Sequence, residues 1–481
     1  MKRFVCLSVI GLTGCSNTAL SPGNDAAVDN DAATPDAATD APAVFDAAPD
    51  AVAPFVKPTP FAIPLSAGGP DQLQSAVAGP NGTFYLAGFA AQTLTGAKYV
   101  TVVKRTATGL DTTFGTAGIA TTAVEFAGGS DEIDIAVQPS GKIIVAATVA
   151  NATNSADRDI AVLRLGTDGK LDTTFGTSGV RILDLNTAVD ATLAAQRDAS
   201  RGLAIGAGGI IYVHGIQRGL LTRTDSDFAV VRLTENGTVD TTFGTAGKFT
   251  VDFGSPSANA TARGIHVMSD GSIIAGGYAS SSISGDTPQP VLYKLTSAGA
   301  LDTAFAEKGL FHATVLTLQT EVYDFAVHGT NLVTGGYGRN TGTTNDWISL
   351  RFDSATGKRD MTWGTSGAVF FDPSGTNLGS NCRNSIALPN GKTLLLGSTG
   401  PSNTPQQNAV FSIVTGTGAL DTSYGTGINV FPFGTGEGGS DQFWGGATSG
   451  NYIIAVGFKG AGTTQTEQLN DDAYGVIFPL Q

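Results

Sequence analysis

Aspartates recur at one position of a repeated segment, and such a row of carboxylates raises the question of a metal site or of acid–base chemistry. The segment reads LDTTFGTAG from Leu110, and the carboxylates are Asp111, Asp172, Asp240, Asp302, Asp360 and Asp421. Ligands of one ion must lie within about 2.5 Å of it. If the repeats close into a ring, equivalent aspartates lie around its circumference, one in each repeat, and cannot converge on one ion. Asp, Thr and Gly also favour tight turns. We therefore interpret the motif as structural, with its aromatic residue packed between repeats.

The histidines and the cysteine of the repeat region form no catalytic or metal-binding pattern. His214, His266, His312 and His328 fall at different places in their repeats, and none belongs to an HExxH motif. No GxSxG, Walker or dinucleotide fingerprint stands in a strand–helix context. Cys382 stands alone and is expected to be a buried packing residue. The sequence thus predicts no metal, no cofactor and no catalytic residue.

Charged side chains can converge only where the first strands of the repeats surround a central channel. At or just before these strands lie the candidate ligand-binding residues of a channel mouth, Asp71, Asp131, Asp198, Arg201, Arg263, Glu321, Arg383 and Asp441. A mixed ring of this kind could bind a polar ligand. The alternative is that these residues are solvated charges in entry loops.

The elements that must position these residues are short strands. The motif aromatics Phe114, Phe175, Phe243, Phe305, Trp363 and Tyr424 are 61, 68, 62, 58 and 61 residues apart, a spacing typical of repeat architectures. Between them, alternating and apolar runs separated by turn residues predict four strands per unit. The central apolar strand recurs seven times, beginning at Thr83, Ile143, Ile210, Ser272, Asn331, Thr393 and Asn451.

These turns and the LDTTFG motif resemble the delta-60 repeat family of bacterial surface and secreted proteins. The resemblance covers nearly all of residues 61–478. It implies an exported repeat protein, but it implies no defined chemistry.

The repeats are expected to close into a ring. Their central strands are apolar on both faces, so each sheet must be covered on both sides. An open stack would need polar end repeats, yet the first and last units are as apolar as the others. We therefore predict an all-β fold, a seven-bladed β-propeller of four-stranded blades over residues 58–481. Residues 61–65 are expected to supply the missing outer strand of the last blade, where Pro64 is tolerable.

The N-terminal segment has the features of an export signal. Lys2 and Arg3 precede an apolar run over residues 4–12 that is too short to span a bilayer. The sequence LTGC ending at Cys15 resembles a lipobox, which implies a lipoprotein signal peptide over residues 1–14 and palmitate-type acylation of Cys15. An ordinary secretory signal is the alternative. Ser16 favours the outer membrane by the sorting rule of Gram-negative lipoproteins.

Residues 15–57 are expected to form a disordered tether rich in Asp, Ala and Pro. The stretch 16–56 holds seven Asp and no Lys or Arg, and such a segment cannot bury enough apolar surface to fold. The net charge of −14 also argues against nucleic acid as a partner.

Together these features predict a monomeric lipoprotein of the cell envelope. We expect it to be anchored to the membrane through the lipid on Cys15 and to present a non-catalytic propeller for protein or glycan binding or for envelope organisation. The alternative is an envelope hydrolase or lyase with its site at one mouth of the channel.

Overall fold

The computed structural model describes residues 54–66, 68–128, 132–153, 157–185, 198–218, 225–253, 260–280, 287–375, 378–400, 407–433, 440–460 and 472–481. The compact unit that is described below spans residues 53–481. The signal peptide, Cys15 and most of the expected tether lie outside the described residues and stay predictions. No helix in the described ranges has the length and apolarity that a membrane span requires.

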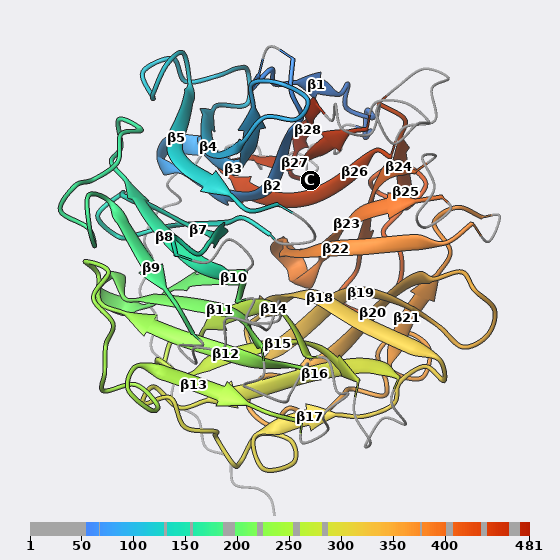
Figure 1. Cartoon of the computed structure of the whole chain (residues 1–481). Coiled ribbons are helices and arrows are strands. Elements are labelled where there is room, and N and C mark those ends of the chain that lie inside the picture. The colour runs from blue at the N-terminus through green and yellow to red at the C-terminus, as the bar shows by residue number, and fades with distance from the viewer. Residues whose placement is uncertain are drawn as a thin grey trace, which may run out of the picture. The chain divides into compact units, whose positions relative to one another are not determined.

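The described strands form seven antiparallel sheets of four strands each, arranged as the blades of a propeller (Figure 1). Blades 1 to 3 comprise β2 (Asp71–Ala78), β3 (Phe84–Ala91), β4 (Lys98–Arg105), β5 (Ile119–Phe126); β6 (Asp134–Val137), β7 (Ile143–Ala150), β8 (Arg158–Leu165), β9 (Val180–Leu183); and β10 (Ala199–Ile205), β11 (Ile211–Arg218), β12 (Ser226–Leu233), β13 (Lys248–Val251).

Blades 4 to 7 follow in chain order. They comprise β14 (Ala260–Val267), β15 (Ile273–Ser280), β16 (Pro288–Leu295), β17 (Leu310–His312); β18 (Gln319–His328), β19 (Asn331–Arg339), β20 (Asp346–Asp353), β21 (Ala368–Phe371); β22 (Ser380–Ala387), β23 (Thr393–Thr399), β24 (Asn408–Val414), β25 (Ile428–Phe431); and β26 (Gln442–Ser449), β27 (Tyr452–Lys459), β28 (Asp472–Pro479), β1 (Phe61–Ala62). Short 3-10 turns at Pro80–Gly82, Ala207–Gly209 and Pro389–Gly391 precede three of the second strands.

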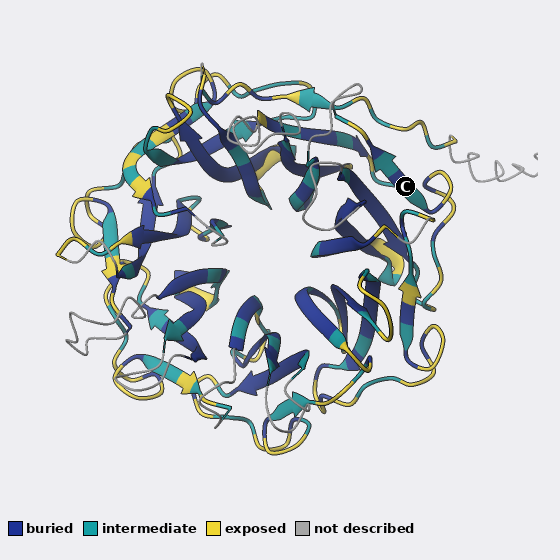
Figure 2. Ribbon diagram, turned by 45° about the vertical axis from the view of Figure 1, so that its right-hand side comes forward, coloured by how far each residue is buried: buried dark blue, intermediate teal, exposed yellow. Residues whose placement is uncertain are grey.

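Burial follows the apolar pattern of the sequence. The second strand of each blade is buried along nearly its whole length, because neighbouring blades cover both of its faces (Figure 2). The fourth strands are partly exposed at the outer rim, as in β9, where Ile182 is 47% exposed. The core is therefore a series of clusters between adjacent blades, such as the one that Tyr85 and Phe114 share with Ile143 and Val145.

The predicted seam between the two ends of the ring is confirmed. Strand β1 pairs with β28, with Phe61 opposite Gly475, and so completes the last blade as its outer strand. The Ile63 N–H then donates to the Ala473 carbonyl at 2.9 Å, and the Ile63 side chain is buried. The strand is shorter than expected, because the ladder ends at Ala62 before Pro64, which has no N–H to donate.

Contacts with the propeller begin before this strand. The ring of Phe55 packs edge-on against Tyr424 at 5.5 Å and against Phe478 at 6.1 Å between centroids. The Tyr424 hydroxyl accepts a hydrogen bond from the backbone N–H of Gln481. The two ends of the propeller unit thus meet at the motif aromatic of blade 6.

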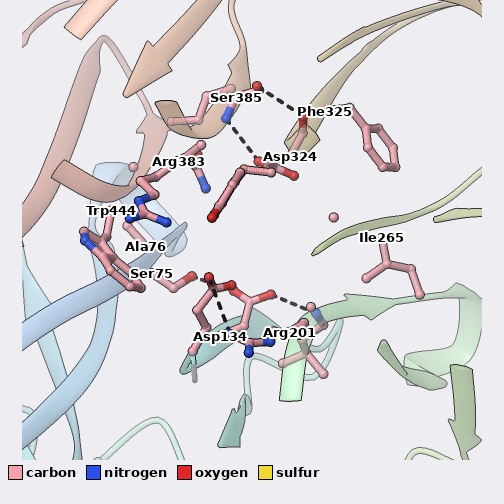
Figure 3. Close-up of a pocket in the computed structure, with 18 of the residues that line it drawn as sticks. Ser75, Ala76, Asp134, Arg201, Ile265, Asp324, Phe325, Arg383, Ser385 and Trp444 are labelled. Atoms are coloured by element: carbon pink, nitrogen blue, oxygen red, sulfur yellow. Dashed lines mark hydrogen bonds and ion pairs between the residues drawn. The ribbon is translucent and has the colours of Figure 1, made fainter. Parts of the chain in front are cut away.

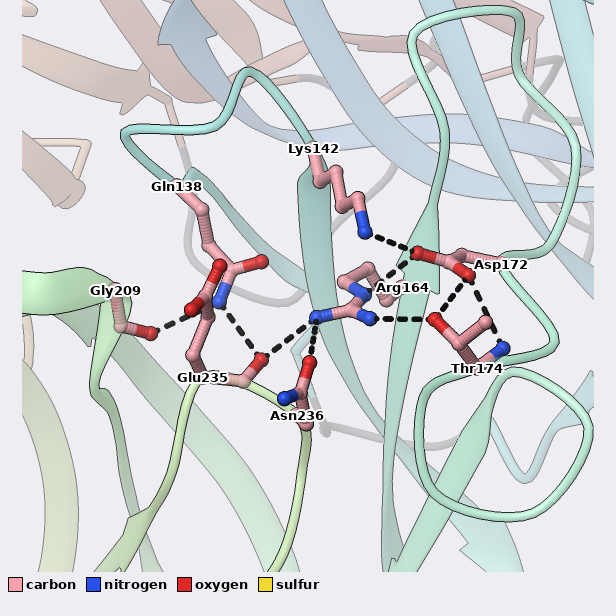
Figure 4. Close-up of polar contacts among 8 residues, drawn as sticks. All are labelled: Gln138, Lys142, Arg164, Asp172, Thr174, Gly209, Glu235 and Asn236. Atoms are coloured by element: carbon pink, nitrogen blue, oxygen red, sulfur yellow. Dashed lines mark hydrogen bonds and ion pairs between the residues drawn. The ribbon is translucent and has the colours of Figure 1, made fainter.

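The repeated aspartates have structural partners, in agreement with the structural interpretation of the motif. Asp172 pairs with Lys142 at 2.8 Å and with Arg164 at 3.0 Å, and it accepts hydrogen bonds from Thr174 (Figure 4). Arg164, whose side chain is fully buried, reaches across to the next blade and donates to the Glu235 carbonyl at 2.8 Å. The carboxylate therefore neutralises and orients a cation that joins blade 2 to blade 3.

The motif aromatics pack against the turn of the following blade. Phe175 is fully buried, and a Cβ added at Gly237, which has φ +81°, would lie 2.6 Å from its ring. The same relation joins Phe114 to Gly169 and Phe243 to Gly299. Glycine is required at these turns both by the positive φ and by the close approach of the ring.

Candidate functional site

The first strands of the blades line the channel, and most of them carry a β-bulge at the same position. The register shifts next to the residues Gln74, Arg201, Arg263, Tyr323, Arg383 and Trp444. A bulged residue is left out of the ladder, and the local change of twist redirects its side chain. The bulges thus place large polar and aromatic side chains at corresponding points around the channel.

Except for Arg263, these side chains line a pocket of about 340 Å³ within the channel, together with neighbouring residues (Figure 3). All seven first strands contribute to its lining. The polar and aromatic residues in the lining include Gln74, Glu132, Asp134, Arg201, His266, Tyr323, Asp324, Arg383 and Trp444. The volume lies at the lower end of the range typical of small-molecule sites.

Two guanidinium groups contact the ring of Tyr323. Arg263 lies 3.8 Å from the ring centroid and Arg383 lies 4.8 Å from it. Arg383 also lies 5.1 Å from the ring centroid of Trp444. Cation–π contacts of this kind hold a guanidinium in place without consuming its hydrogen-bond donors.

The arginines in and beside the pocket differ in their partners. Glu132 forms ion pairs with Arg263 and, at 3.9 Å, with Arg201. Arg383 has no ion pair with any described carboxylate, and its buried Nε has no hydrogen-bond partner. Among the described residues, the side chain of Arg383 therefore has only the aromatic rings of Tyr323 and Trp444 as partners.

Two carboxyl groups, Asp134 and Asp324, occupy equivalent positions in blades 2 and 5. Asp134 accepts hydrogen bonds from the Ser75 hydroxyl at 2.6 Å and from the Leu203 N–H at 2.8 Å. Asp324 accepts one from the Ser385 N–H at 3.1 Å. Each carboxyl thus joins its blade to the first strand of the next blade.

Burial changes the acidity of both groups. It raises the pKa of Asp134 to about 6 and that of Asp324 to about 7, and the hydrogen bonds that they accept oppose this shift. Burial also lowers the pKa of His266 in the pocket lining. At neutral pH the pocket therefore combines arginine cations with a neutral imidazole and with carboxyls that are in part protonated.

Glu321 lies in a separate network beside the pocket. The Tyr337 hydroxyl donates to Glu321 Oε2 at 2.7 Å and lies 2.9 Å from the Tyr323 hydroxyl. This network fixes the Tyr323 ring on which the two arginines stack.

The other predicted channel-mouth residues lie elsewhere. Asp71 accepts the Ala473 N–H, Asp198 the Leu185 N–H, and Asp441 the Phe433 N–H at 2.7 Å. All three are buried where one blade ends and the next begins. Asp131 lies outside the described residues. The structure thus brings together Arg201, Arg263 and Arg383 and places these three aspartates at blade junctions.

Sequence reasoning missed the aromatic and acidic partners of the arginines. Tyr323, Trp444 and Glu132 stand next to apolar residues and read as ordinary strand positions. Tyr323 and Trp444 stand at the bulged position of their strands, as Arg201, Arg263 and Arg383 do in theirs. An alignment of the repeats on these arginines would therefore have found the two aromatic residues, but it would not have found Glu132.

The comparisons with known proteins support the propeller fold. A family model described as "Domain of unknown function (DUF5122) beta-propeller" matches residues 138–175, 211–243 and 269–305. Each of these segments ends at the motif aromatic of its blade, at Phe175, Phe243 and Phe305. The chain is similar to this family over these three segments. No curated protein matches the chain.

Solved structures similar to the chain are distant from it in sequence. A protein of unknown function from Dyadobacter fermentans DSM 18053 is 13% identical, with a TM-score of 0.46 over 89% of this chain and 100% of its own. Polysaccharide lyase Uly1 is 11% identical, with a TM-score of 0.47 over 86% of this chain and 90% of its own. An alpha-L-arabinanase from Penicillium chrysogenum is 9% identical, with a TM-score of 0.40 over 88% of this chain and 99% of its own. At these values no activity is transferred from them to this chain.

Proposed function

We propose that this chain is an envelope-anchored lipoprotein whose propeller binds an acidic sugar unit in the channel pocket. The observation that carries the proposal is the placement of Arg383. Its guanidinium lies against the rings of Tyr323 and Trp444, lines the pocket and has no described carboxylate partner. A guanidinium in a sheltered pocket favours an anion that can accept its hydrogen bonds.

The ligand that best matches this pocket has a carboxylate or a sulfate on a compact polar ring. Guanidinium groups bind such oxyanions in a planar, two-pronged geometry. The indole of Trp444 and the phenol of Tyr323 offer apolar faces beside the charge. A volume of about 340 Å³ limits the bound unit to a small ligand or to the end of a longer chain.

We favour binding over the hydrolase or lyase alternative because the acidic groups of the pocket are already engaged. Asp134 accepts hydrogen bonds from two neighbouring blades, Asp324 accepts one from the next blade, and Glu132 is paired with arginines. A general acid or base must instead reach the proton that it transfers. The described pocket residues therefore fit recognition better than proton transfer.

The anchor and the tether complete the proposal. A lipid on Cys15 would hold the protein at the envelope, and residues 15–57 would let the propeller stand away from the bilayer. An acidic polysaccharide of the envelope or its surroundings would then be within reach of the pocket.

A binding panel tests the proposed function. The purified protein is titrated with uronic-acid, sulfated and neutral oligosaccharides of equal length at low and at physiological salt. We expect the acidic members to bind, with affinity that falls as salt rises, and the neutral members to bind at least about tenfold more weakly, a difference of about 1.4 kcal/mol. Equal affinity for neutral and acidic members would contradict the proposal. Release of shortened products would favour the enzyme alternative instead.

A further inference from the structure

A second group of acidic side chains lies away from the pocket, at the junction of blades 2 and 3. One carboxylate oxygen from each of Asp159, Asp184 and Asp198 lies within 4.8 Å of the corresponding oxygens of the other two. Asp159 and Asp198 are buried, and Asp184 is exposed. Asp157, also buried, is close enough to act electrostatically on Asp198. Four carboxyl groups of one sign thus share a small, largely sheltered volume.

One oxygen of this group lacks a partner. Asp198 is only 1% exposed, and its Oδ2 accepts the Leu185 N–H, while its Oδ1 is buried with no hydrogen bond. An unsatisfied oxygen of this kind is costly in a folded protein unless a cation or a donor satisfies it. The nearby Lys248, which interacts electrostatically with Asp198 and Asp184, donates from its ammonium to the Leu185 carbonyl and to Gln217.

We propose that Asp159, Asp184 and Asp198 form a calcium site at this junction, with Asp157 in its outer surroundings. Calcium binds oxygen ligands at about 2.3–2.6 Å, so two of its ligands are separated by at most about 5 Å. The observed 4.8 Å limit fits that requirement. The three residues that bring ligand atoms together are all aspartates, which favours a hard cation over zinc.

The bound ion would join two blades. Asp159 lies on β8 and Asp184 follows β9 in blade 2, whereas Asp198 directly precedes β10 in blade 3. An ion held by all three would neutralise the repulsion at the junction and add a bond between the blades.

A second trio, Asp225, Asp227 and Asp252, provides the matched control. It stands at the corresponding place of blade 3, with its oxygens also within 4.8 Å of one another. All three of these aspartates have interaction partners, and Ala260 stands at the position that corresponds to Asp198. The blade 3 trio therefore has the acidic residues without the buried, unpartnered oxygen.

The test measures calcium binding to the full chain after removal of metal with a chelator. Calcium chloride is titrated by calorimetry at neutral pH, and thermal unfolding is followed with and without 1 mM calcium. We expect binding with a dissociation constant on the order of 10⁻⁴ M and a rise in melting temperature. Asp198→Asn should weaken binding by about tenfold or more and remove the thermal shift, whereas Asp227→Asn should keep both.

Asp184→Asn keeps the proposal testable if Asp198→Asn does not fold, because Asp184 is exposed. It should also weaken binding, by about tenfold. Absence of calcium binding by the unmodified protein would overturn the proposal. So would an unchanged affinity in Asp184→Asn or Asp198→Asn, or a loss of binding in Asp227→Asn alone.

Discussion

The ring of Phe175 fills the space above Gly237 in the next blade, so closely that a Cβ at Gly237 would lie 2.6 Å from it. This contact joins blades 2 and 3 through a residue of the repeated motif and a turn glycine about sixty positions later in the chain. It accounts for two features of the repeat at once, the aromatic of LDTTFG and the glycine of the following turn.

Phe175→Ala should lower the free energy of unfolding by about 3–5 kcal/mol, because the side chain is fully buried between blades. Urea unfolding followed by tryptophan fluorescence measures the effect. Met361→Ala is the control, since Met361 is 57% exposed and its replacement should change stability by less than about 0.5 kcal/mol. An unaltered unfolding midpoint in Phe175→Ala would remove the structural interpretation of the motif.

Deletion of residues 58–66 should open the ring. It removes strand β1 and the buried side chains of Ile63 and Leu65, and it leaves the edge of β28 unpaired. Burial of the two aliphatic side chains alone contributes about 3–6 kcal/mol. Calorimetry should show a clear fall in melting temperature. A deletion variant that melts at the temperature of the intact protein would show that the seam does not stabilise the ring.

Stability should depend on pH through Asp324 and Asp134. Their pKa values in the folded protein, about 7 and about 6, lie above the ordinary value of 3.8, so the folded state binds more protons between about pH 4 and 7. Their contribution to stability is therefore greatest below pH 4 and falls as pH rises through this window.

Asp324→Asn isolates this effect, because the amide oxygen can still accept the Ser385 N–H but does not titrate. When the pH is raised from 4.5 to 8, the free energy of unfolding should fall less in the variant than in the unmodified protein. The difference between the two falls should be about 1 kcal/mol or more. Denaturant unfolding at the two pH values gives the comparison. The same pH-dependent loss in both proteins would show that Asp324 does not titrate as described.

Cys15→Ala should release the protein from membranes or leave it unprocessed, since one residue is proposed to carry the whole anchor. Palmitate labelling and membrane fractionation of cells that express the variant measure the change. Ser16→Ala is the control and should keep the label. Normal labelling of Cys15→Ala would overturn the lipoprotein part of the proposed function.

The fold was predictable because its determinants are local and repeated. The apolar central strands, the turn residues and the spacing of aromatics such as Phe175 and Tyr424 predict seven blades of four strands. The seam also followed from the sequence, because the last unit lacked a fourth strand and residues 61–65 were left over. The end of the ladder at Ala62 depends on the missing N–H of Pro64.

The site was less predictable because it depends on geometry across blades. A bulge decides whether the side chain of Trp444 or Tyr323 enters the channel, and no short sequence pattern specifies that bulge. The charge of Asp71 and Asp441 and their place before a first strand make them candidate ligand-binding residues in the sequence. Their backbone partners, Ala473 and Phe433, belong to the preceding blade, so these contacts become visible only when the blades are placed side by side.

The central claim concerns Arg383, and one pair of variants tests it most directly. Calorimetric titration with a uronic-acid oligosaccharide is carried out on the unmodified protein, on Arg383→Gln and on Lys170→Gln. Lys170 is 85% exposed on an outer turn, so its replacement removes the same charge far from the pocket. We expect Arg383→Gln to bind at least about tenfold more weakly, equivalent to about 1.4 kcal/mol, and Lys170→Gln to bind as the unmodified protein does. Equal affinities for all three proteins would contradict the proposed site.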